Sequence, residues 1–279
     1  MAKKSFLRKA GSFVAGIIIW ILKAAWHVLK VIAGAVWNFV SGLFGKAAAS
    51  AAKKTETRKA QYVALDEVKA FEGTPDDFEN WLYSSKSTVG LILGARGSGK
   101  SGLGLKLLEN WASRGRRVFA MGFGNAGLPA WIESVKSPED VPNGAVLLAD
   151  EGGISFSSRE SMSDANRLLS KLLFIARHKD ISILFISQNS ANIEVNTIRQ
   201  ADYLLLKRPS LLQKDFERGK IKDVYESVAD DFKKLGGDKG LVYVYSDAFR
   251  GFASNALPSF WSERASKAFG GVKLGAKSN

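Results

Sequence analysis

No other part of the chain limits the choice of fold as strongly as VGLILGARGSGKS, residues 89–101. From Gly94 to Ser101 it fits the pattern G-x-x-x-x-G-K-[ST], which carries meaning where a strand precedes it and a helix follows it. Glycines let the backbone curl so that consecutive N–H groups point at phosphate oxygens, and the positive end of the helix adds to this field. The pattern predicts a nucleotide-binding loop in which Lys100 reaches the β- and γ-phosphates and Ser101 binds Mg²⁺. The residues expected to contact the nucleotide are Gly94, Ala95, Arg96, Gly97, Ser98, Gly99, Lys100, Ser101 and Gly102.

A second motif, AVLLADEGG, begins at Ala145. Its apolar residues predict a strand that delivers Asp150 and Glu151 to the carboxyl edge of a parallel sheet, where open α/β sheets bind their ligands. Asp150 is predicted to hold Mg²⁺ through water, and Glu151 to polarise the attacking water. Together the two motifs predict ATP and Mg²⁺ as ligands and ATP hydrolysis as the reaction.

Two other kinds of nucleotide-binding protein share parts of these motifs. DEGG, residues 150–153, also fits the D-x-x-G spacing of GTPases, but no N-K-x-D follows it, so the usual reader of guanine is missing. A small-molecule kinase is the other alternative. Glutamate directly after the strand aspartate is more typical of enzymes that hydrolyse ATP, and we therefore expect hydrolysis.

Beyond residue 60, short apolar runs alternate with helical patterns, which is typical of a parallel sheet with crossover helices. Strands are predicted at 88–94, 116–123, 144–150, 181–187, 202–207 and 241–246. Helices are predicted at 100–114, at 163–178 with Ser163 as its cap, and at 211–235, which Gly219 can divide in two. The expected fold class is α/β, a P-loop NTPase of the RecA-like kind with a mainly parallel sheet flanked by helices.

The positive charge is concentrated at the N-terminus. The chain has 279 residues and a formal net charge of +13, of which residues 1–60, with eleven Lys or Arg and Glu56 as the single acid, carry +10. The remaining +3 does not by itself demonstrate a basic face on the rest of the chain. Cysteine is absent, which excludes disulfides, thiolate catalysis and cysteine-based zinc sites, and two histidines are too few for a histidine metal cluster.

The N-terminal segment is apolar, and Lys23 and Lys30 interrupt it. It is too long for a signal peptide, and its uncharged stretches, 10–22 and 31–45, are shorter than the ~20 residues that cross hydrocarbon. Polar residues at helical spacing favour a helix lying in the headgroup plane, while a spanning helix with outward-reaching lysines and a helix packed on a partner protein are the alternatives. The predicted division is a membrane-associating helical segment, 1–46, a basic linker, 47–60, and a P-loop ATPase domain, 61–279.

The strand ISILFIS ends beside Gln188, whose amide is placed to sense the γ-phosphate. The phosphate loop, the strand ending in Asp-Glu, the helix and strand IARHKDISILFISQ and then IRQADYLLLK span residues 85–210. This series resembles the FtsK/HerA superfamily of DNA-translocating ATPases, and most of all the genome-packaging ATPases of membrane-containing, particularly archaeal, viruses. The resemblance implies a ring, commonly a hexamer, that threads double-stranded DNA. It also implies an arginine acting across the subunit interface, for which Arg177 matches best and Arg159 and Arg199 are rivals; a solvated arginine at a helix end is the alternative reading of Arg177.

Two segments depart from the family pattern. A packaging motor does not need the N-terminal segment, and residues 246–271 have no counterpart, so they either contact DNA or, as we favour, cover a sheet edge and pack on a neighbour. We expect a membrane-anchored, DNA-translocating ATPase for viral genome packaging, located in the virion or on the cytoplasmic side of the host membrane. The alternatives are a membrane-bound phage assembly or secretion ATPase of the Zot type and a membrane scaffold whose nucleotide site controls oligomerisation.

Overall fold

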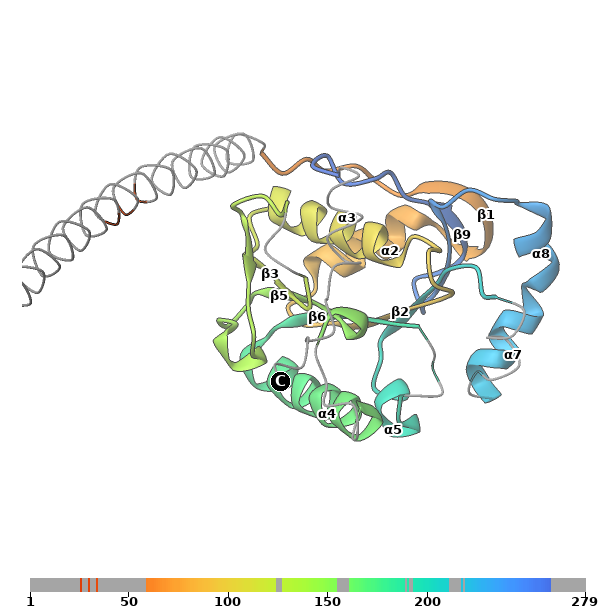
Figure 1. Cartoon of the computed structure of the whole chain (residues 1–279). Coiled ribbons are helices and arrows are strands. Elements are labelled where there is room, and N and C mark those ends of the chain that lie inside the picture. The colour runs from red at the N-terminus through yellow and green to blue at the C-terminus, as the bar shows by residue number, and fades with distance from the viewer. Residues whose placement is uncertain are drawn as a thin grey trace, which may run out of the picture. The chain divides into compact units, whose positions relative to one another are not determined.

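The computed structural model describes residues 26, 30, 34, 59–123, 127–154, 161–188, 190, 193–210, 217 and 219–261 (Figure 1). The chain divides into two units, Met1–Glu56 and Thr57–Asn279, and the fold described below belongs to the second.

A sheet of nine strands forms the centre of the second unit, in the order β1-β9-β8-β7-β2-β6-β5-β3-β4. Neighbouring strands from β7 to β4 run parallel, and β8, β9 and β1 extend the sheet with antiparallel pairs. The strands are β1 Asp66–Gly73, β2 Val89–Leu93, β3 Val118–Met121, β4 Ile132–Ser134, β5 Val146–Asp150, β6 Ser182–Ser187, β7 Tyr203–Leu206, β8 Leu241–Tyr245 and β9 Phe249–Ser254. The mainly parallel α/β sheet expected from the sequence is therefore present.

Helices cover both faces of this sheet (Figure 1). Helices α2, Pro75–Ser84, and α3, Lys100–Ser113, pack on one face, and α4, Ser161–Lys179, α7, Gly219–Ser227, and α8, Ala229–Lys234, pack on the other. A short helix α5, Val195–Ile198, and two 3₁₀ turns, Pro138–Asp140 and Glu151–Gly153, complete the described elements. All residues of β2 are buried, because a parallel strand with helices on both sides has no face in water.

The structure corrects several details of the expected elements. Strands β1, β4 and β9 and helix α2 were not predicted, and β9 lies inside the segment 246–271. That part of the segment extends the sheet, whereas the sheet edge beyond it is formed by β1. Helix α4 begins at Ser161, so the cap predicted at Ser163 is wrong. Within the described part of 211–235, the break lies at Val228, between α7 and α8, and Gly219 starts α7.

Helix α3 has a buried polar face that holds both ends of the described domain. The Glu109 carboxylate is 0% exposed and accepts hydrogen bonds from Gln61 N at 3.1 Å and from Ser259 N at 3.0 Å. It also accepts the Ser259 hydroxyl and pairs with Lys106 Nζ at 3.0 Å. Lys106 in turn donates to Gln61 O at 3.0 Å. Residues from the start and the end of the domain are thereby fastened to the helix that follows the phosphate loop.

The N-terminal segment lies almost wholly outside the described residues, so its predicted division into 1–46 and 47–60 stays a prediction. Trp26, Lys30 and Gly34 are helical and exposed, and Lys30 Nζ lies 5.6 Å from the centre of the Trp26 ring. Within the described part of the chain, no helix combines the length and the apolar character that crossing a membrane requires.

Candidate nucleotide site

The loop between β2 and α3 turns through three glycines with positive φ. Gly94 has φ 146°, Gly97 has φ 77° and Gly99, the N-cap of α3, has φ 95°. At Gly99 a Cβ atom would lie 2.5 Å from the carbonyl oxygen of Lys239, so both the backbone angle and the space require glycine there. The loop therefore leads directly into the N-terminus of a helix of 14 residues, the usual geometry for binding a phosphate.

Lys100 is the first residue of α3 and is 7% exposed. Its Nζ donates to the carbonyl oxygens of Gly94 at 2.7 Å and Ala95 at 2.9 Å. Burial lowers the pKa of Lys100 from its ordinary value, and the negative charges of Asp150 and Glu151 oppose this shift. A phosphate bound in the loop would add negative charge beside the ammonium, which offsets its desolvation.

The two sequence motifs meet at one hydrogen bond. Ser101 Oγ donates to Asp150 Oδ2 at 3.0 Å, and Asp150 Oδ1 accepts the N–H of Gly152 at 3.0 Å. Burial raises the pKa of Asp150, and the hydrogen bonds from Ser101 and Gly152 and the charge of Lys100 oppose this shift. The residues predicted to bind the metal and the phosphates thus lie at the same edge of the sheet.

Glu151 and Gln188 join the same cluster. Ser187, at the end of β6, donates its hydroxyl to Glu151 Oε2 at 2.5 Å. A Cβ on Gly152 would lie 3.4 Å from both Asp150 Oδ1 and Gln188 Nε2. The ends of β5 and β6 therefore bring the carboxylates of the second motif beside the amide that was predicted to sense the γ-phosphate.

The loop also contains a buried polar atom that a phosphate would satisfy. Within the described residues, Ser98 Oγ is buried and has no hydrogen-bond partner, although Ser98 N donates to Ala95 O at 3.2 Å. A buried hydroxyl without a partner is costly, and an anion in the loop would remove that cost. The residues present consequently fit a triphosphate, and the bonded Ser101 and Asp150 pair fits Mg²⁺.

The two predicted arginines that the structure describes, Arg177 and Arg199, are not part of this cluster. Arg177 is exposed in the last turn of α4, which precedes β6, so it lies at the opposite edge of the sheet from the phosphate loop. Arg199 is exposed at the end of α5, before β7. Arg159 lies outside the described residues. An action on the phosphates of the same chain is therefore ruled out by position for Arg177, and its predicted action on a neighbouring copy stays a prediction.

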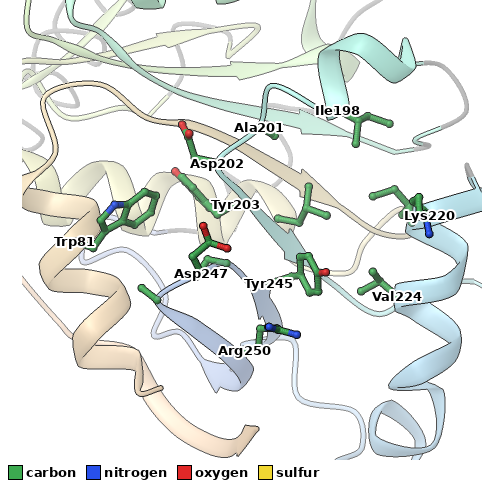
Figure 2. Close-up of a pocket in the computed structure, with 14 residues that line it drawn as sticks. Trp81, Ile198, Ala201, Asp202, Tyr203, Lys220, Val224, Tyr245, Asp247 and Arg250 are labelled. Atoms are coloured by element: carbon green, nitrogen blue, oxygen red, sulfur yellow. The ribbon is translucent and has the colours of Figure 1, made fainter. Parts of the chain in front are cut away.

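A pocket of about 900 Å³ is lined by other residues than those of the phosphate loop. Trp81 of α2 lines one side and Val224 of α7 the other, with Tyr203 and Tyr245 between them (Figure 2). Tyr203 starts β7 and Tyr245 ends the antiparallel β8, so the pocket opens at the sheet edge opposite the loop. The nucleotide site is thus distinct from this pocket.

Lys207 is a residue near the site to which the sequence reasoning gave no role. It follows β7 directly, is 0% exposed, and its Cβ would lie 2.7 Å from a Cβ on Gly94. The lysine at the end of the apolar run YLLLK was a signal for such a role, because a buried amino group needs hydrogen-bond acceptors around it.

No protein-family profile and no curated protein matches the chain. Among solved structures, it is similar to B204, the DNA-packaging ATPase from Sulfolobus Turreted Icosahedral Virus, at 13% identity and a TM-score of 0.44, over 62% of this chain and 98% of that one. It is also similar to the pCW3 conjugation coupling protein TcpA, at 14% identity and a TM-score of 0.46, over 78% of this chain and 72% of that one. The N-terminal domain of zonular occludens toxin from Neisseria meningitidis matches at 18% identity and a TM-score of 0.29, over 43% of this chain and 76% of that one. At these levels of similarity the activity has to be inferred from the chain's own residues.

Proposed function

We propose that the chain is a Mg²⁺-dependent ATPase that moves double-stranded DNA as a viral genome-packaging motor. The observation that carries the ATPase is the hydrogen bond between Ser101 and Asp150, which joins the two motifs beside Lys100. Lys100 is bonded to the carbonyl oxygens of the glycine loop, and Glu151 directly follows Asp150. Two segments 49 residues apart supply a phosphate cradle, a lysine and adjacent carboxylates at one sheet edge. That combination suits phosphoryl transfer to water.

In the proposed reaction, the loop N–H groups and Lys100 bind the β- and γ-phosphates. Glu151, oriented by Ser187 at 2.5 Å, accepts a proton from a water whose oxygen attacks the γ-phosphorus. The bond from that phosphorus to the β–γ bridging oxygen breaks, giving ADP and phosphate. Ser101 and Asp150 would hold Mg²⁺, which supplies positive charge to the phosphates when bound.

DNA translocation rests on the resemblance of the motif series, from the phosphate loop to Gln188, to DNA-translocating ATPases. The same resemblance supports a homo-oligomeric ring, commonly a hexamer, in which Arg177 reaches the nucleotide of the next copy. Membrane attachment through residues 1–46 rests on the apolar and basic composition of that segment. Location in the virion or on the cytoplasmic side of a host membrane follows from these two proposals together.

ATP turnover by the full chain with Mg²⁺, measured with and without duplex DNA, tests the function. We expect duplex DNA to stimulate hydrolysis severalfold and Lys100→Ala to abolish it. Lys233→Ala, which removes an exposed lysine from α8, serves as the control and should turn over ATP like the wild type. Lack of ATP binding by the wild-type chain would refute the proposal.

The same assay separates the alternatives. Turnover that ignores DNA but rises with lipid vesicles would favour the secretion ATPase of the Zot type, and binding without turnover would favour the membrane scaffold. Flotation with liposomes tests the anchor, since deletion of residues 1–46 should abolish it. A deleted chain that still floats would contradict membrane attachment through this segment.

A further inference from the structure

Lys207 is a buried lysine beside the phosphate loop that the proposed hydrolysis does not use. Its backbone N–H donates to Leu93 O at 2.8 Å, which places it level with the end of β2, where the loop begins. Its side chain is 0% exposed. Burying an amino group is costly unless acceptors surround it, so its contacts have to account for its position.

Four acceptors surround the Lys207 amino group. Nζ lies 2.9 Å from the carbonyl oxygens of Lys239, Gly240 and Leu241, and 3.0 Å from Oδ1 of Asn255. Three consecutive carbonyl groups turn toward one nitrogen only if the backbone at the start of β8 is held in one conformation. The lysine therefore fixes the segment 239–241 with respect to the end of β7.

This segment lies against the phosphate loop. A Cβ on Gly99 would be 2.5 Å from Lys239 O and 3.5 Å from Lys207 Cε, and a Cβ on Gly94 would be 2.7 Å from Lys207 Cβ. Ala95 N also donates to the carbonyl oxygen of Arg208 at 3.2 Å. The start of the loop, at Gly94 and Ala95, therefore contacts Lys207 and Arg208. Its end, at Gly99, contacts the Lys239 carbonyl that Lys207 binds.

We propose that Lys207 is a positioning residue of the nucleotide site, which holds the Lys239 carbonyl against Gly99 and so keeps the phosphate loop in its binding conformation. The proposal rests on the proposed function, because it requires that the loop bind ATP. Gly99 directly precedes Lys100, so a displaced Lys239 carbonyl allows the start of α3 to move. Leu241 begins β8 and Asn255 directly follows β9, so this C-terminal strand pair is then part of the nucleotide site.

The test compares Lys207→Met with Lys106→Met in the full chain. Lys106 is a matched control, since it is also buried, 2% exposed, and bonds to Gln61 O and Glu109 away from the loop. The readouts are the Kd for a fluorescent ATP analogue with Mg²⁺, the KM and kcat for ATP, and hydrogen exchange over residues 94–101. We expect Lys207→Met to raise Kd and KM about tenfold, to leave kcat within about twofold and to speed exchange. Lys106→Met should lower Tm and leave Kd unchanged.

If Lys207→Met does not fold, Asn255→Ala replaces it. That change keeps the lysine and removes one of four acceptors, and it should raise Kd about threefold. A wild-type Kd in the folded variant, whichever of the two is used, overturns the role of Lys207 while the ATPase stands. A wild-type chain that binds no ATP overturns the proposed function and the role of Lys207 together.

Discussion

Replacing Glu109 with alanine should lower the free energy of unfolding by about 3–5 kcal/mol, the cost of breaking a buried ion pair from one side. The carboxylate is 0% exposed and accepts from Gln61 N at 3.1 Å, Lys106 Nζ at 3.0 Å, and both N–H and hydroxyl of Ser259. Without it, the amino group of Lys106, itself 2% exposed, has lost its carboxylate partner and is left with Gln61 O at 3.0 Å. Since domains of this size are commonly stable by about 5–15 kcal/mol, the change removes a large share of the total.

The assay is equilibrium unfolding in urea, followed by tryptophan fluorescence, on the full chain. Glu133→Ala is the control, because Glu133 pairs with Arg117 at 2.8 Å with both side chains more than half exposed, at 52% and 61%. An exposed pair contributes about 0–1 kcal/mol, so the control should change little. If Glu109→Ala lowers the free energy of unfolding no more than Glu133→Ala does, then the buried polar face of α3 does not stabilise the domain and the reasoning is wrong.

Three further outcomes are expected. Gly104→Val should lower the free energy of unfolding by about 1–3 kcal/mol in the same assay, because even a Cβ would lie 2.8 Å from Leu148 Cδ1. An unchanged free energy would mean that the core side chains move to make room for the valine. Glu151→Gln should lower kcat by about 10²–10⁴ while the ATP analogue still binds, and an unchanged kcat would remove Glu151 from its role as base. Burial lowers the pKa of Lys207 to about 7 from its usual 10.5, so above pH 7 the unfolded chain binds more protons and stability rises with pH. Between pH 7 and 9 the free energy of unfolding of the wild type should rise by about 2 kcal/mol relative to that of Lys207→Met. A difference in free energy between the two chains that does not change with pH would contradict this pKa.

The phosphate loop and the acidic pair could be predicted because each is a contiguous motif at the end of an apolar run. A parallel sheet brings the carboxyl ends of β2, β5 and β6 to one edge, so the order of the segments was enough to place Lys100 near Asp150. The contact between Lys207 and Lys239 was beyond such reasoning. It depends on the register of β8 against β7, which no motif in either strand specifies.

The missed elements differ in how far the sequence could have shown them. Helix α2 begins with a capping box, since Thr74 Oγ1 accepts Asp77 N at 3.2 Å and Pro75 follows the cap, and these residues were a readable signal. Strand β1 gave none, because all eight of its residues are exposed and its sequence, DEVKAFEG, has no regular alternation. It becomes a strand because β9 offers it an edge with which to pair.

The attachment of Gln61 and Ser259 to one carboxylate has a consequence for how the domain comes apart. Glu109 lies 48 positions from the first and 150 from the second, so its bonds close nearly the whole domain into a noncovalent ring. Neither end can unfold without breaking a hydrogen bond to the buried Glu109 carboxylate, and breaking the bond at one end weakens the binding of the other end. Loosening at the two ends is therefore a single event, and the amide protons of Gln61 and Ser259 should exchange with solvent at rates that change in step.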